Sequence, residues 1–335
     1  MKLSINQTYK NYITTALIGL GLFACSVASA QQKSPVAGKS WNLELPASTL
    51  LPMSWIAPGT FVMGSPESEK GRKADESPQT TVTLTKGYWL GNTEVTIGQW
   101  KAVTGLNLRD KVTKMLNDET LYDFEGKQQK IRDYMHFDPN SPDKIMANEN
   151  DRLPMYFVSW YEAMDFCKKL TEQERTAGRL PDGYEYTLPT EAQWEYACRA
   201  GTTGATSALP ANVNTNDESL DAIAWYGKNS PNGYTGRGLS NLMAGPRDAG
   251  KKAANKWGMQ DMLGNLWEWC RDWYGPYPGG NVTDPVGPAT GIGKVNRGGS
   301  WGSGINDERS ANRAKNPPNE DSAWRGFRVA LCSVK

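Results

Sequence analysis

The densest group of side chains that could do chemistry lies near the C-terminus, between residues 307 and 315. Acids and bases alternate closely there: Asp307, Glu308, Arg309, Arg313 and Lys315. Carboxylates beside guanidinium groups can bind a polar ligand or transfer protons as general acids and bases. The same composition is typical of a solvated, salt-bridged surface. We favour the surface interpretation and keep the site as the alternative.

Thiols offer a second chemistry. The chain has five cysteines and a single histidine, His136, without any C-x-x-C spacing, so a Cys/His zinc site is not expected. Removal of an N-terminal leader would take Cys25 with it. Four cysteines would remain, and an even number in an oxidising compartment favours two disulfides: Cys167, Cys198, Cys270 and Cys332.

Residues 1–30 have the pattern of a signal peptide. Lys2 and Lys10 precede and begin a largely apolar stretch, and Ala28-Ser29-Ala30 is an A-x-A cleavage site. We therefore expect a periplasmic or secreted protein. The alternative is a lipoprotein anchored at Cys25, although Phe23 fits the lipid-attachment pattern poorly. No later stretch reaches the roughly 18 apolar residues of a membrane helix.

The charge balance excludes one class of partner. Lys+Arg total 37 against 36 Asp+Glu, a net charge of +1, which gives no electrostatic case for nucleic acid or an anionic membrane. The 13 tryptophans and 34 glycines indicate short elements, tight turns and large buried aromatic side chains.

Three capping boxes place the helices that would position these residues. A hydroxyl with Gln or Glu three residues later occurs at Thr96, Ser159 and Thr190. The first helix should end at Gly105 and the third at Gly201. Alternating residues predict strands at 80–84 and 325–331. The pattern is α+β.

The domain organisation follows from local composition. Residues 31–50 are interpreted as a linker and 51–335 as one domain. Residues 106–150 are rich in polar residues and contain a Pro-flanked loop, so we interpret them as a surface insertion.

Six motifs occur in a fixed order along this domain: Pro58–Ser65 (PGTFVMGS), Asn92–Thr96 (NTEVT), Leu188–Gly201 (LPTEAQWEYACRAG), Asp261–Trp269 (DMLGNLWEW), Arg297–Trp301 (RGGSW) and Gly326–Arg328 (GFR). Together they resemble the formylglycine-generating-enzyme (sulfatase-modifying-factor) family over about residues 51–332. The resemblance implies a C-type-lectin-like α+β fold with short helices, short strands and many loops.

The resemblance also implies a chemistry that this chain lacks the residues to perform. Family enzymes oxidise a sulfatase cysteine to formylglycine, and two cysteines shortly after the R-G-G-S motif hold copper. Soft thiolates select Cu(I), but residues 301–310 contain no cysteine, and Ser303 stands about where the first would fall. We expect no copper and no cysteine oxidation. A sister branch that oxidises thiols with iron needs several histidines, so it is excluded.

By the same resemblance, a ligand groove would lie beside the R-G-G-S motif. Its candidate residues are Ser300, Trp301, Ser303, Asp307, Glu308 and Arg313. Arg297 and Arg328, next to glycines in the motifs, are expected to be structural anchors that donate to backbone carbonyls. Trp267 and Trp269 are expected in the core.

The resemblance implies calcium in the 261–268 loop. The ligands would be Asp261, Gly264, Leu266 and Glu268, with Gly264 and Leu266 acting through backbone oxygens, because calcium takes six to eight oxygen ligands. The alternative is an ordinary turn in which Glu268 caps a backbone group.

The resemblance further implies a disulfide from the helix after Ser159 to the terminal strand, which would join Cys167 to Cys332. Family enzymes pair their equivalent of Cys198 with a cysteine near position 310, where this chain has Ser310. We expect Cys198 to pair with Cys270 instead. Four buried free thiols are the alternative.

We therefore expect an exported binding or accessory protein that lacks the oxidase, with a peptide, protein or glycan as its unidentified ligand. One alternative is an enzyme of the same fold with altered chemistry. Another is a structural component of an envelope or secretion assembly. An ordered metal beside Ser300 would favour the enzyme, and a flat aromatic surface around residues 106–150 would favour the assembly component.

Overall fold

The computed structural model describes residues 36–124, 126–135, 146, 150–210, 215–230 and 245–334. All of them belong to one unit that spans Ser34–Lys335. The predicted signal peptide with Cys25, and also His136, lie outside the described residues. Within them, no helix combines the length and the apolar character that crossing a membrane requires.

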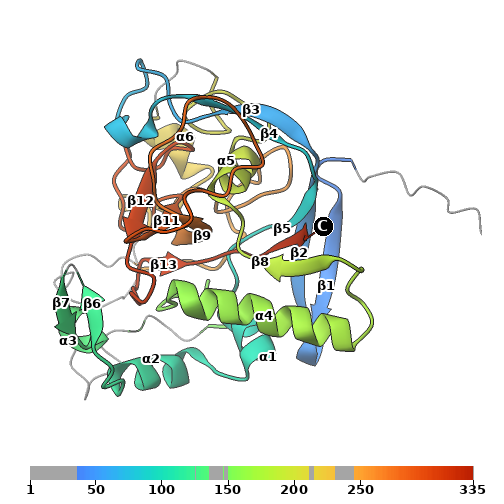
Figure 1. Ribbon diagram of the computed structural model, residues 1–335, viewed down its shortest axis with the longest axis vertical. Helices are drawn as coiled ribbons and strands as arrows, with labels where there is room; N and C mark the ends of the chain where they lie inside the picture. Colours follow the sequence, from blue (N-terminus) through green and yellow to red (C-terminus); the bar gives the residue numbers. More distant parts are fainter. Residues whose placement is uncertain are drawn as a thin grey trace, which may run out of the picture. The chain divides into compact units, whose positions relative to one another are not determined.

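A five-stranded antiparallel sheet joins the two ends of the domain (Figure 1). Its strand order is β1-β2-β5-β14-β8, with the bounds β1 Ser40–Leu45, β2 Thr49–Ile56, β5 Tyr88–Gly91, β14 Ala330–Ser333 and β8 Tyr184–Thr187. The C-terminal strand β14 pairs with β5 and with β8, so chain segments far apart in sequence share one sheet.

The remaining strands of the described residues form three smaller sheets. A four-stranded sheet has the order β12-β11-β9-β13, a three-stranded sheet the order β10-β4-β3, and β6 pairs with β7 alone. Their bounds are β3 Gly59–Met63, β4 Thr80–Leu84, β6 Tyr122–Phe124, β7 Lys127–Gln129, β9 Trp267–Trp273, β10 Gly280–Thr283, β11 Lys294–Arg297, β12 Arg313–Asn316 and β13 Arg325–Gly326. The predicted strand at 80–84 is confirmed as β4.

The helices are mostly short: α1 Ile97–Thr104, α2 Leu108–Leu116, α3 Ile131–Met135, α4 Trp160–Thr176, α5 Glu191–Arg199 and α6 Asp217–Asp221, with the 3-10 turns η1 Pro46–Ser48 and η2 Ala74–Glu76. The three predicted capping boxes begin α1, α4 and α5. Helix α1 ends before Gly105 as expected, whereas α5 ends at Arg199 because Ala200 already adopts a left-handed φ of 46°.

Aromatic side chains join α1 and α4 to the C-terminal strands. Trp100 of α1 stacks on Phe166 of α4 with 5.6 Å between ring centroids. Phe327, just after β13, meets Phe166 edge-on at 5.2 Å. All three are buried. The predicted α+β class with short helices, short strands and many loops is thus confirmed.

Within residues 106–150, helix α2 buries Val112 and Met115, and the interpretation of this segment as an insertion stays a prediction. Two other expectations were wrong. Residues 40–50, interpreted as part of a linker, form β1 and the start of β2, because Leu43 and Leu45 pack into the core. The expected strand at 325–331 is two strands in different sheets, β13 and β14.

Candidate functional site

The segment after β11 turns sharply through two glycines. Gly298 and Gly299 have φ angles of 100° and 79°, which glycine adopts without steric cost. A Cβ at Gly299 would lie 2.4 Å from Oε1 of Glu308. Glycine at this position therefore lets the Glu308 carboxyl group pack directly against the backbone of the turn.

Ser300 and Ser303 form the next turn. The Ser300 N–H donates to Oγ of Ser303 at 2.9 Å, the Ser303 N–H donates to the Ser300 carbonyl at 2.9 Å, and the two hydroxyls lie 3.2 Å apart. Ser300 is buried and Ser303 is half-buried. The donors at this site are hard hydroxyl oxygens, which do not fit Cu(I).

Glu308 is the groove candidate with unused chemistry. Its side chain is 0% exposed, and neither carboxyl oxygen has a hydrogen-bond partner among the described residues. Burial, together with the nearby charge of Asp307, raises the pKa of Glu308 well above its ordinary value. The backbone N–H groups of Ser300 and Gly264 oppose this rise in pKa, and the net effect favours the uncharged form of the acid next to the Ser300 turn.

Most of the charged segment is buried, so the surface interpretation was wrong, although the predicted salt bridges are present. Arg309 pairs with Glu69 at 2.6 Å and with Glu76 at 2.5 Å. Arg313 binds both oxygens of Glu191 at 2.6 and 2.8 Å.

The outer members of the segment stay at the surface. Lys315 is exposed and Asp307 is partly exposed, and Asp307 pairs with Lys73 at 3.0 Å. Arg313, by contrast, is buried and bound to both oxygens of Glu191, so it is not available as the ligand contact that we had expected.

Trp301 was also misplaced as a groove residue. It is 0% exposed, stacks on Trp324 with a centroid distance of 5.8 Å, and donates from Nε1 to the Ala323 carbonyl at 3.1 Å. Trp301 belongs to the core, as Trp269 does.

The two motif arginines are structural anchors, as expected. Arg328 donates to the carbonyls of Gly91 and Asn92 at 3.0 and 3.1 Å. Arg297 donates to the Ser310 carbonyl at 2.5 Å. Each also neutralises buried carboxylates, a role that the sequence did not suggest: Arg297 pairs with Glu191 and Glu195.

Glu268, the predicted calcium ligand, is engaged elsewhere. Arg328 donates to both of its oxygens at 2.6 Å, and Trp194 Nε1 donates to Oε2 at 2.8 Å. Glu268 thus neither fits a calcium ligand nor caps a backbone group. Asp261 keeps one unpartnered oxygen, Oδ1. Calcium in this loop stays a prediction that would rest on Asp261 and on the carbonyls of Gly264 and Leu266.

A second unpartnered acid lies near this loop. Both oxygens of Glu94 are buried without a partner in the described chain. Burial and the charges of Asp261 and Glu268 raise its pKa well above the ordinary value. Even so, the described residues contain no group of three or more His, Cys, Asp or Glu that could hold a metal ion.

All four described cysteines are free thiols, so neither predicted disulfide is formed in this structure. Burial, and then the thiol of Cys332 in β14, raise the pKa of Cys167 in α4. Cys198 instead contacts Ser310, with 3.4 Å between Sγ and Oγ. The pairing in oxidised protein stays a prediction.

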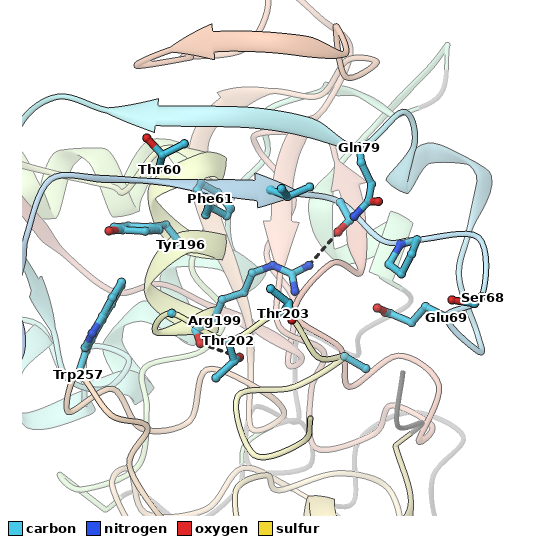
Figure 2. Close-up of a pocket in the computed structure, with 15 residues that line it drawn as sticks. Thr60, Phe61, Ser68, Glu69, Gln79, Tyr196, Arg199, Thr202, Thr203 and Trp257 are labelled. Carbon is cyan, nitrogen blue, oxygen red and sulfur yellow. Dashed lines mark hydrogen bonds between the residues drawn. The ribbon is translucent and has the colours of Figure 1, made fainter. Parts of the chain in front are cut away.

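Sequence reasoning missed a cavity of about 540 Å³ between β3, α5 and the loops beside them. Figure 2 shows three aromatic side chains on its left, Phe61, Tyr196 and Trp257, with Arg199 in the centre and Ser68, Glu69 and Gln79 on the right. None of the predicted groove residues lines it. Phe61 and Tyr196 belong to two of the motifs, but no spacing in the sequence brings them together.

The structure defines an α+β domain with short helices, short strands and many loops, and comparison with known proteins names its family. The model of the sulfatase-modifying factor enzyme 1-like domain matches residues 43–332. The chain therefore belongs to the sulfatase-modifying-factor (formylglycine-generating-enzyme) family.

This chain is similar to relatives that carry different names, an enzyme and a chaperone. The formylglycine-generating enzyme of Streptomyces coelicolor is 35% identical over 182 residues, which cover 53% of this chain and 52% of the relative. The chain thus spans about half the length of that enzyme. The chaperone protein LppX of Paenibacillus barcinonensis is 26% identical over 265 residues, covering 74% of this chain and 81% of the relative.

Among solved structures, Treponema denticola variable protein 1 superposes with a TM-score of 0.62 at 25% identity. The match covers 90% of this chain and all of that one. It agrees with the α+β fold described above.

Proposed function

We propose that this chain is an extracytoplasmic binding or accessory protein that keeps the family scaffold without copper-dependent cysteine oxidation. The observation that carries the proposal is the Ser300–Ser303 turn, in which two hydroxyls occupy the segment after the R-G-G-S motif. Hydroxyl oxygens do not replace thiolates as Cu(I) ligands. The A-x-A site at residues 28–30 supports the location outside the cytoplasm.

Two further observations support a role other than oxidation. Cys198, the described thiol that contacts this segment, donates to Ser310, and burial raises its pKa to about 11, so it is a thiol rather than the thiolate that a metal requires. In addition, the Paenibacillus barcinonensis protein that this chain matches over 81% of its length is called a chaperone. A chaperone has an accessory role.

The experiment is to recover what the protein binds. The immobilised chain is incubated with libraries of peptides and of glycans in air, with and without copper, and bound molecules are eluted and weighed by mass spectrometry. The proposal expects ligands recovered with unchanged mass under both conditions. A ligand recovered lighter or heavier after contact with the wild-type protein would contradict it.

The second candidate is an enzyme of altered chemistry, and Glu308 favours it. A buried carboxyl group without a partner is uncommon in a purely structural role, and perturbed acids gather at functional sites. If the recovered ligands change mass, Glu308→Gln should abolish the change while leaving capture intact. That result would establish the enzyme instead of the binding protein.

A further inference from the structure

The cavity between β3 and α5 is built around an aromatic wall. The rings of Phe61 and Tyr196 lie 5.1 Å apart at 41°, and those of Tyr196 and Trp257 lie 4.8 Å apart at 64°. Phe61 and Trp257 are half-buried, so part of each ring faces the open space (Figure 2). A Cβ at Gly59 would lie 2.2 Å from the Tyr196 hydroxyl oxygen. Glycine there makes room for the wall.

Polar side chains line the rest of the cavity: Figure 2 shows Ser68 and Gln79 on the side away from the aromatic rings and Thr203 near the centre, beside Arg199. Ser68, Gln79 and Thr203 line the cavity with exposed side chains. Unlike Arg199 and Glu69, which are engaged by other residues, these three side chains make no side-chain hydrogen bond within the described part of the chain. Hydroxyl and carboxamide groups both donate and accept. The cavity therefore offers a set of neutral polar groups that suit a ligand with several hydroxyls.

The charged lining residues are already neutralised. Arg199 donates from Nε to Glu195 at 2.8 Å and from its other nitrogens to the carbonyls of Gly64 and Gly204 at 2.8 and 3.1 Å. Glu69 accepts from Arg309 at 2.6 Å. Neither charge is left for a ligand. A charged ligand would thus lose hydration on entering without gaining an opposite charge.

We propose that this cavity binds a neutral saccharide. One face of a sugar ring carries C–H groups that pack on aromatic rings, here the half-buried rings of Phe61 and Trp257, which the buried Tyr196 supports from behind. The hydroxyls of the ring would bond to Ser68, Gln79 and Thr203. The volume of about 540 Å³ lies in the range of about 300–1,000 Å³ that is usual for small-ligand sites.

This inference rests on the binding function proposed above and gives it a ligand class and a site. A peptide with an aromatic residue would fill the same wall, but it would not match the opposite side with an array of hydroxyls. The lining therefore favours the saccharide, and binding of a peptide instead is one possible result of the titration below.

The test is calorimetric titration of the full chain with neutral mono- and disaccharides, a uronic acid and a tryptophan-containing tripeptide. The neutral saccharide should bind with an affinity that does not change with salt, since no charge is involved. Trp257→Ala should weaken it at least about tenfold, and Gln79→Ala about threefold or more. Trp257→Phe keeps a ring and should retain most of the affinity.

Tyr161→Ala is the matched control, because Tyr161 is 52% exposed and lies on α4, outside the cavity lining. The affinity of this variant for the saccharide should equal that of the wild-type protein. Thermal melting of each variant checks that it is folded.

Three results would overturn the inference. Binding of the uronic acid or the tripeptide in preference to neutral sugars would make the ligand class wrong. A saccharide whose affinity survives Trp257→Ala would make the site wrong while the binding function stands. No saccharide binding at all, with peptides captured elsewhere on the chain, would likewise remove this inference and leave the broader proposal intact.

Discussion

Two buried glutamates show how much a side chain's partners decide its role. Glu268 and Glu308 are both 0% exposed. Glu268 accepts from Arg328 and Trp194, whereas both oxygens of Glu308 lack a partner in the described structure. Removing one partner of a buried ion pair leaves an uncompensated buried charge, whereas burial of an unpaired acid favours its uncharged form.

The same substitution at the two positions should therefore have different costs. Glu268→Gln leaves Arg328 buried without its counter-charge and should lower the free energy of unfolding by about 3–5 kcal/mol. Glu308→Gln removes a carboxyl group that no described residue pairs with, and it should change the free energy of unfolding by less than about 1 kcal/mol at pH 7. Urea unfolding of both variants beside wild type measures the difference. Equal losses would mean that Glu308 has an unrecognised cationic partner.

For individual side chains, the sequence indicated which arginines are important but not which residues surround them in the fold. It placed Arg297 and Arg328 correctly as anchors, because they lie in motifs beside glycines. It read Arg309 and Arg313 as surface charges, since nothing local shows that their carboxylate partners come from positions 69, 76 and 191. Ion pairs between distant segments depend on the fold, which a local pattern does not contain.

Elements were more predictable because their signals are local. Each capping box needs only a hydroxyl and a Gln or Glu three residues apart, and each one found begins a helix. The splitting of 325–331 into β13 and β14 was not predictable, because the strand-favouring residues Phe327 and Val329 lie between the two pieces. Only the different partner strands separate β13 from β14.

Removal of the α5 cap should have a defined cost. The Thr190 hydroxyl accepts from the Gln193 N–H at 3.1 Å, so Thr190→Ala should destabilise the protein by about 1 kcal/mol. Thr113→Ala, the same change on an exposed position of α2, is the control and should be neutral or slightly stabilising. Chemical denaturation compares the two. An unchanged midpoint for Thr190→Ala would show that the cap does not contribute.

A cysteine introduced at position 310 should form a crosslink between its chain segment and helix α5. Because Sγ of Cys198 lies 3.4 Å from Oγ of Ser310, the side chains already point at each other. Ser310→Cys should form a disulfide to Cys198 in air, which non-reducing peptide mapping detects. In wild type the same mapping decides the predicted Cys167–Cys332 and Cys198–Cys270 pairs. If Ser310→Cys yields only free thiols or a bond to Cys270, the placement of Ser310 against α5 is wrong.

The whole molecule buries several acids whose protonation links stability to pH. Asp272 is buried and accepts from the Glu191 N–H at 3.0 Å. Burial and the charge of Glu191 raise its pKa from 3.8 to about 7. The folded state therefore holds this proton where the unfolded state has lost it. The contribution to stability is full below about pH 4 and is lost as the pH rises through about 7.

Asp272→Asn should consequently flatten the pH dependence of stability. The variant keeps an acceptor for the Glu191 N–H but cannot ionise, so it should lose less stability than wild type between pH 4 and pH 8. Denaturant midpoints measured across that range provide the comparison, with the surface change Glu67→Gln as control. A variant that follows the wild-type pH profile would show that Asp272 does not carry the dependence.

The order of six sequence motifs was enough to predict the fold of the domain. The same motifs did not predict the aromatic cavity. Phe61, Tyr196 and Trp257 come from three separate segments, and each alone has the composition of ordinary core. The absence of a thiol pair after Ser300, by contrast, can be read from the residue types alone, and the Ser300–Ser303 turn agrees with it.

We propose that this family member does not oxidise cysteine. The direct measurement is incubation of the purified chain with a sulfatase-type cysteine peptide, a reductant, Cu(I) and oxygen, followed by mass spectrometry of the peptide. The Streptomyces coelicolor relative, run in parallel, is the positive control. We predict that the peptide keeps its cysteine with and without copper. A copper-dependent aldehyde product would contradict the account.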